Sequence, residues 1–247
     1  MSTAFRYSAS QLANLLGHFG AQRQAEAMAS VWQNAMPQAY EVAVGRHQQT
    51  VKPLYVPANL VQLSSQPCTT AAQVESTKRQ LAEAVAVLPS AQQAPILEQC
   101  VRKVQTEFGK VTENSAIARF QQAFGQTVLV DSSLKVAHID GLVFQGRIDG
   151  LLEDGTVIEV KNRVNRLFRT VREYERMQVL TYLELLDRPS ALLVESYKDQ
   201  LLWHRVDRDT VWWRQHVLAP LQHVHSRLCQ IPTSVDKQEE LFATIGY

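Results

Sequence analysis

The spacing of apolar and polar residues divides the chain into a helical first half and a strand-rich second half. Up to residue 125 the apolar positions recur every three or four residues, which is typical of amphipathic helices. This pattern predicts a first helix that begins after Ser8 and fades before Pro37, with further helices over 71–88, 91–108 and 110–125.

Two local details accompany these helices. Ser8 and Gln11 have the spacing of a capping box, and Tyr7 and Leu12 that of a hydrophobic staple, so Ser8 is the expected N-cap. Residues 37–70 are rich in Gln, Pro and Ser and are predicted to form an irregular connection.

In the second half, β-branched residues alternate with polar ones, which predicts strands. The expected strands are 127–131, 134–140, 142–152, 156–161, 191–197 and 201–206, and the expected helices 170–187 and 209–229. The order predicts an α/β or α+β fold with a central mixed β-sheet flanked by helices. We expect residues 1–100 to form an N-terminal helical region and residues 101–247 to form the core.

Composition narrows the class of protein. The net charge of +1 does not by itself indicate a nucleic-acid binder, but five basic residues and no acidic one lie between Lys161 and Arg172. Cys68, Cys100 and Cys229 are odd in number and far apart, which excludes a disulfide framework and predicts a reducing, intracellular setting. The sequence has neither a long apolar run nor a basic–apolar leader, so we expect no membrane partner and no secretion.

The segment GRIDGLLEDGTVIEVKNR carries Asp149, Glu159 and Lys161 among apolar strand residues. Glu159 and Lys161 are two residues apart and therefore point to the same face. A three-residue loop of Glu153, Asp154 and Gly155 places Asp149 opposite Glu159, whereas a two-residue Asp154–Gly155 turn places Gly150 there. A bulge at Gly150 is a further way to bring Asp149 into register.

Two carboxylates and the carbonyl of Val160 would form an oxygen-rich site that suits Mg²⁺ or Mn²⁺. An ammonium group beside such a site orients or deprotonates a water molecule, or neutralises charge on a phosphate. The alternative is a solvated strand whose Glu159 and Lys161 face water.

Asp149 followed by Glu159-Val160-Lys161 resembles the motif of the PD-(D/E)XK nuclease superfamily. Gln178-x-x-x-Tyr182 resembles the QxxxY motif of its RecB-like and λ-exonuclease-like branch. Gly109-x-x-x-Glu113 is similar to the GxxxE element of the same branch. The resemblance covers about residues 105–205. It departs from the pattern at Ile148, where the superfamily name has proline, and Asp140 is a rival for the aspartate.

The resemblance implies a restriction-endonuclease-like core and a role for each matching residue. Asp149, Glu159 and the Val160 carbonyl would bind Mg²⁺ or Mn²⁺, and Glu113 would add a ligand or position a metal-bound water. Lys161 would activate that water or stabilise the transition state. Gln178 and Tyr182, one helical turn apart, would orient Lys161 or a DNA phosphate.

Arg163, Arg166, Arg169 and Arg172 recur every three residues, a spacing that on a helix keeps neighbours roughly together. Next to a phosphodiesterase site they are expected to bind the DNA backbone. The resemblance further implies a basic pocket for a terminal 5′-phosphate.

The function expected from the resemblance is a metal-dependent DNA exonuclease of recombination or repair, of the kind found in viruses and phages. DNA is the expected partner, with a single-strand annealing protein as a candidate second one. The alternatives are an endonuclease specific for DNA structure and a catalytically idle nucleic-acid-binding module.

Overall fold

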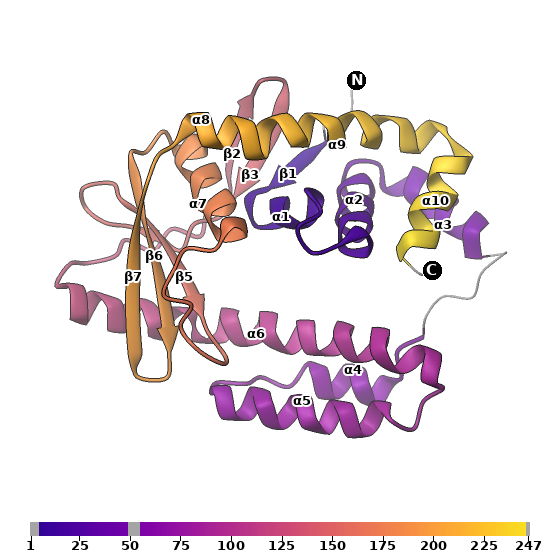
Figure 1. Ribbon diagram of the computed structural model, residues 1–247, viewed down its shortest axis with the longest axis horizontal. Helices are drawn as coiled ribbons and strands as arrows, with labels where there is room; N and C mark the ends of the chain where they lie inside the picture. The colour runs from indigo at the N-terminus through magenta and orange to yellow at the C-terminus, as the bar shows by residue number, and fades with distance from the viewer. Residues whose placement is uncertain (1–4, 49–54, 246–247) are drawn as a thin grey trace.

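The computed structural model describes residues 5–48 and 55–245 (Figure 1). Its strands form two mixed sheets, in the orders β1-β3-β2 and β4-β5-β6-β7. They are β1 Arg6–Ser8, β2 Lys135–Ile139, β3 Leu142–Gly146, β4 Gly150–Leu151, β5 Val157–Asn162, β6 Ser190–Tyr197 and β7 Gln200–Asp207. The predicted α+β class, with mixed β-sheet flanked by helices, is confirmed, but the strands form two sheets rather than one central sheet.

Helices surround both sheets. The first group is η1 Ala9–Gln11, α1 Leu12–Leu15, α2 Ala21–Ala35, α3 Pro37–Gln48, α4 Ala58–Ser64, α5 Ala71–Val85 and α6 Ser90–Phe124. The second group is α7 Glu173–Leu186, α8 Thr210–Trp213, the π-helical η2 Arg214–Leu218, α9 Ala219–Gln230, η3 Ile231–Thr233 and α10 Val235–Ile245. No helix in the described part of the chain is long and apolar enough to cross a bilayer.

The four-stranded sheet lies between α7 and α6, and the side chains of β5 alternate between the two helices. Val157 belongs to the large core that includes α7, while Ile158 and Val160 pack with Ala116 and Phe120 of α6. This two-residue alternation leaves Glu159 and Lys161 on the α7 face. The sheet therefore presents the two charged residues to one helix and apolar residues to the other.

The N-terminal residues contribute to two different cores. β1 pairs in parallel with β3, and Trp32 of α2 stacks on Phe242 of α10 in the large core. In contrast, α4, α5 and the first half of α6 enclose a core of their own, around Leu60, Leu81 and Ile96. In Figure 1, α4 and α5 lie along α6, on the side away from α9 and α10. The division at residue 100 stays a prediction.

Two predictions near the N-terminus are wrong. Residues 6–8 form a strand that pairs with β3. Ser8 is the N-cap residue of η1, as predicted, but its side chain makes no capping bond and contacts the Ser10 hydroxyl at 3.1 Å, so the predicted capping box is absent. The predicted irregular connection contains two helices, α3 and α4. Residues 49–54 of that connection lie outside the described residues.

Three element boundaries also differ from the prediction. The helices expected at 91–108 and 110–125 are one helix, α6, which continues through Gly109. The strand expected at 127–131 makes only an isolated bridge, between Leu129 and Leu151. The strand expected at 142–152 is divided between the two sheets as β3 and β4, and Asp149 lies in the break.

Candidate functional site

The site begins where β4 ends its pairing with β5. Gly150 pairs with Ile158 and Leu151 with Val157, which is the register of the three-residue loop. Gly155 has the left-handed φ of 84° that this loop requires. Asp149, the next residue back along the chain, therefore lies at the level of Glu159, so of the two loop registers the chain adopts the three-residue one.

A hydrogen-bonded network joins β5 to α7 on the face that carries Glu159. The Lys161 Nζ donates to Glu159 Oε1 at 2.6 Å and to Gln178 Oε1 at 2.8 Å. The Gln178 Nε2 donates to the same Glu159 oxygen at 2.9 Å and to the Tyr182 hydroxyl at 2.9 Å. The motif residues of strand and helix are thus in direct contact.

Burial and neighbouring carboxylates together set the protonation states of Lys161 and Tyr182. Burial lowers the pKa of Lys161, but the carboxylates of Glu159, Asp149 and Glu175 together raise it by more, so the ammonium stays charged. Burial, with Glu159 second, raises the pKa of Tyr182, so its hydroxyl stays protonated. Lys161 is thus a fixed positive charge rather than a proton acceptor at neutral pH.

Asp149 joins the network through the backbone. Its Oδ2 accepts the Val160 N–H at 2.6 Å, at the edge of β5 that β4 leaves unpaired. Since N–H and C=O of a strand residue point to the same edge, the Val160 carbonyl lies on this edge as well. Burial first, and Glu159 second, raise the pKa of Asp149 to about 8.

Glu113 reaches the same region from α6. Its pKa is raised by burial and then by repulsion from Glu159, while Lys161 acts in the opposite direction. The three carboxylates Glu113, Asp149 and Glu159 therefore influence one another. Within residues 5–48 and 55–245, however, no three His, Cys, Asp or Glu side chains converge closely enough to hold a metal ion as they stand.

One oxygen of the Glu159 carboxylate lacks a hydrogen-bond partner. Glu159 is 3% exposed, and its Oε2 is buried without a hydrogen-bond partner, although Oε1 has two. A buried, unpartnered carboxylate oxygen is costly, and a hard cation is a suitable partner for it. The residues present are therefore chemically suited to a hard divalent cation such as Mg²⁺ or Mn²⁺, which Asp149, Glu159 and the Val160 carbonyl would hold with Glu113 nearby.

The rival aspartate is elsewhere. Asp140 lies in the turn between β2 and β3 with a left-handed φ of 47°. Its carboxylate accepts a hydrogen bond from Arg214 Nη1 at 2.9 Å and is exposed. Asp149, not Asp140, is the aspartate in contact with the motif strand.

The four arginines do not lie on one helix, contrary to the spacing argument. They occupy the connection between β5 and α7, where Arg169 has a left-handed φ of 62° and Arg172 is the N-cap of α7. Arg166, Arg169 and Arg172 line a cavity of about 440 Å³ together with Phe168, Tyr197 and Gln200, here called the arginine pocket. Their DNA-binding role stays a prediction.

Arg163 differs from the other three because it is buried. Its Nη1 donates to Glu175 at 2.6 Å and its Nε to Glu195 at 2.9 Å, and both carboxylates are fully buried. Sequence reasoning missed Glu175 and Glu195. The signal for Glu195 was its position within the apolar strand ALLVESY, where a charged residue needs a buried partner.

Glu195 organises the basic connection. Besides Arg163 it accepts the backbone N–H groups of Phe168 at 2.7 Å and Arg169 at 3.1 Å, and it pairs with His204 at 2.9 Å. Burial alone raises the pKa of Glu195, but the bonds from Phe168, His204 and Arg163 lower it, so the carboxylate is ionised. The arginine pocket is therefore built on a buried negative charge.

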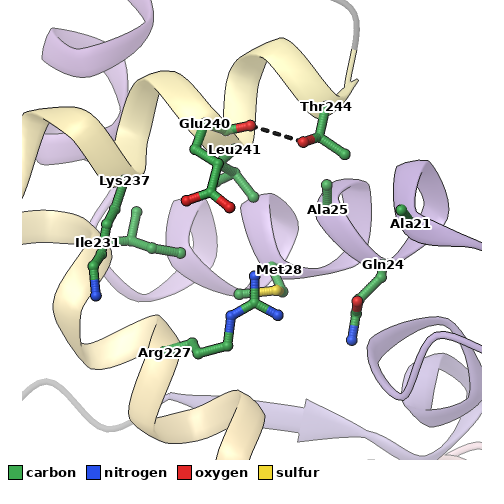
Figure 2. A pocket seen from close by; sticks show the side chains of 10 residues that line it. All are labelled: Ala21, Gln24, Ala25, Met28, Arg227, Ile231, Lys237, Glu240, Leu241 and Thr244. Carbon is green, nitrogen blue, oxygen red and sulfur yellow. Dashed lines mark hydrogen bonds between the residues drawn. The ribbon is translucent and has the colours of Figure 1, made fainter.

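A further pocket, of about 250 Å³, is formed by other elements (Figure 2). It lies between α2, α9 and α10, with Met28 and Leu241 on its apolar side. Figure 2 shows Arg227 and Glu240 pointing into it. None of the predicted site residues lines it, so it is separate from the network around Lys161.

The fold resembles known nuclease structures. Over 93% of this chain and 93% of the other, it matches the crystal structure of an alkaline exonuclease, LHK-Exo, from Laribacter hongkongensis, with a TM-score of 0.51 and 17% identity. The complex of LHK-Exo with dAMP matches over the same shares with a TM-score of 0.50 and 17% identity. No protein-family model matches the chain, and no curated protein matches it in sequence.

At this identity the likeness is one of fold. It agrees with the resemblance to the λ-exonuclease-like branch of the PD-(D/E)XK superfamily that the sequence motifs indicated, and it extends over nearly the whole chain. A match over 93% of the chain takes in most of the N-terminal hundred residues, which matched no motif.

Proposed function

We propose that this protein is a divalent-metal-dependent deoxyribonuclease, an exonuclease that acts on DNA ends in recombination or repair. The observation that carries the proposal is the state of the Glu159 carboxylate. One oxygen binds Lys161 and Gln178, and the other is buried without a partner beside Asp149. The fold likeness to an alkaline exonuclease, also crystallised with the DNA nucleotide dAMP, supports DNA as the substrate.

Each residue of the network has a task in phosphodiester hydrolysis. Mg²⁺ or Mn²⁺, when bound, supplies a Lewis acid that polarises a phosphoryl oxygen. The charged Lys161 stabilises negative charge that develops on the phosphate or holds the attacking water. Gln178 and Tyr182 keep the ammonium in position, and Asp149 and Glu159 hold the cation.

The test is incubation with linear and closed-circular duplex DNA in Mg²⁺, Mn²⁺ or EDTA. We expect wild-type protein to degrade the linear form only, and only with metal. Lys161→Ala should lose the activity, while Lys110→Ala, an exposed lysine on α6, should keep it. Cleavage of the circle would identify an endonuclease, and DNA left intact by wild type in both metals would indicate an idle binding module.

A further inference from the structure

A second cavity lies at the end of β5, between the start of α5, α6 and the β6–β7 turn. It has a volume of about 530 Å³ and is here called the hairpin pocket. Residues from the α4–α6 helical unit and from the sheet line it together, among them Ala71, Ala72, Arg119, Arg163, Lys198 and Asp199. It is therefore the place where the helical unit meets the nuclease core.

Two of the arginines that line this pocket each have a buried guanidinium N–H group without a hydrogen-bond partner. Arg163 is 9% exposed and held by Glu175 and Glu195, yet its Nη2 makes no hydrogen bond. Arg119 donates to Ser196 Oγ at 2.5 Å and to the Lys198 carbonyl, while its buried Nε is also unpartnered. Buried charged donors without an acceptor are costly and uncommon, so both indicate a missing acceptor.

The rest of the lining favours an anion. The charged lining residues are Arg119, Arg163 and Lys198 against the single carboxylate Asp199. Ala71 and Ala72 belong to the first turn of α5, a helix of 15 residues whose amino end carries partial positive charge. Its cap, Thr70, accepts the Gln73 N–H, so the first-turn amides before Gln73 are available to a ligand.

We propose that the hairpin pocket binds an internal backbone phosphate of the DNA strand, close to the phosphodiester that is hydrolysed. This inference rests on the proposed function and deepens it. Arg163 follows Lys161 by two residues, and a strand advances about 3.3 Å per residue, so neighbouring phosphates of one strand lie within reach. The α4–α6 unit then forms one wall of the DNA-binding channel.

The first test compares two substitutions that add the same charge to α5. Ala72→Glu places a carboxylate in the pocket at a position where acidic residues stabilise a helix, whereas the exposed Ala82→Glu lies outside the pocket. Both are made in a Lys161→Ala background, and binding of a linear duplex is measured by fluorescence anisotropy over a range of salt. We expect Ala72→Glu to weaken binding roughly tenfold and to reduce the salt slope by about one.

Ala82→Glu should change binding less than about twofold, since exposed charges are strongly screened. Equal losses for the two variants would overturn the proposal. Wild-type protein that cleaves no DNA, but whose binding still depends on Ala72, would refute the proposed hydrolysis and leave this inference standing.

The second test locates the phosphate. Single uncharged methylphosphonate linkages are introduced along the strand, and duplexes with and without a 5′-phosphate are compared. If the site is internal, one position of the neutral linkage should weaken DNA binding by the wild-type protein. The same linkage should leave DNA binding by Arg119→Gln unchanged. Removing the 5′-phosphate should not alter this difference. If the loss of binding caused by Arg119→Gln occurred only with a 5′-phosphate, the bound phosphate would be the terminal one and the proposal of an internal site would be wrong. If circular dichroism shows that Arg119→Gln is misfolded, Arg119→Lys is used in its place.

Discussion

The Asp149 carboxylate accepts the backbone N–H of Val160, with 2.6 Å between Oδ2 and the nitrogen. This bond takes the place of a strand partner on β5 and holds Asp149 at the level of Glu159. Two carboxylates are thereby kept together in a buried site, and burial and repulsion raise the pKa of Asp149 to about 8. The arrangement is unfavourable without a cation, and this property can be measured.

Asp149→Asn should stabilise the protein in EDTA at pH 8. The unfolded aspartate ionises near pH 4, whereas Asp149 in the folded protein does so near 8. Between these values the folded state holds a proton that the unfolded state has released, so stability falls as pH rises from 4 to 8. Asparagine removes this loss, and each kcal/mol gained raises Tm by about 2–4 °C.

Thermal melts at several pH values in EDTA check this expectation. Asp199→Asn, in the exposed turn between β6 and β7, is the control and should follow the wild-type profile. A wild-type Tm at pH 8 equal to or above that of Asp149→Asn would contradict the account.

Gly146→Ala should slow hydrolysis without loss of metal binding. A Cβ at Gly146 would lie 2.6 Å from Cε1 of Tyr182, so the ring must move, and Gln178 loses its contact with the hydroxyl. Because Gln178 positions Lys161, we expect a rate reduction of about 10–100-fold, as for other residues that orient a site. Cleavage rates and Mn²⁺ calorimetry measure the two effects.

Gly45→Ala is the matched control, because a Cβ there meets nothing within 4 Å. It should leave both the rate and Mn²⁺ binding unchanged. A Gly146→Ala rate equal to that of wild type would mean that Tyr182 does not position the network.

Glu195→Ala should destabilise the fold by about 3–5 kcal/mol, since it leaves Arg163 partly unpaired in a buried place and removes the acceptor for Phe168 and Arg169. Urea denaturation measures this change. Glu75→Ala breaks an exposed pair with Lys78 and should cost no more than about 1 kcal/mol. A cost for Glu195→Ala as small as that control would show that the buried pair does not support the basic connection.

Arg166→Ala should weaken DNA binding and lower its salt slope by about one, because one phosphate contact from the arginine pocket is lost. Binding across a salt series measures both quantities. Arg205→Ala, on β7 and paired with Asp207, is the control and should keep the wild-type slope. An unchanged slope for Arg166→Ala would remove the arginine pocket from the DNA interface.

The sequence predicted the geometry of the hairpin that carries Asp149, Glu159 and Lys161, because this geometry is local. Glu153-Asp154-Gly155 has the composition of a three-residue loop, and Gly155 adopts the left-handed backbone that fixes the register. With the register fixed, the positions in the sequence place Asp149 at the level of Glu159 and put Glu159 and Lys161 on the same face of the strand. The four-residue spacing of Gln178 and Tyr182 places both on one face of α7.

The sequence failed where long-range contacts decide the structure. Residues 6–8 form a strand because they pair with β3, more than 130 residues away in the chain, and no local pattern records that partner. Gly109 would be expected to weaken a helix, yet α6 continues through it, with Phe108 buried in one core and Ala116 in another. The basic connection is ordered by Glu195 from a strand that follows α7.

The most direct test of the central claim is anomalous diffraction from crystals grown with MnCl₂. The account predicts a manganese peak between the Asp149 carboxylate and Glu159 Oε2, on the edge that carries the Val160 carbonyl. A map without a peak there, in crystals where manganese is bound elsewhere or Asp149 turns away from Glu159, would contradict the metal-dependent mechanism.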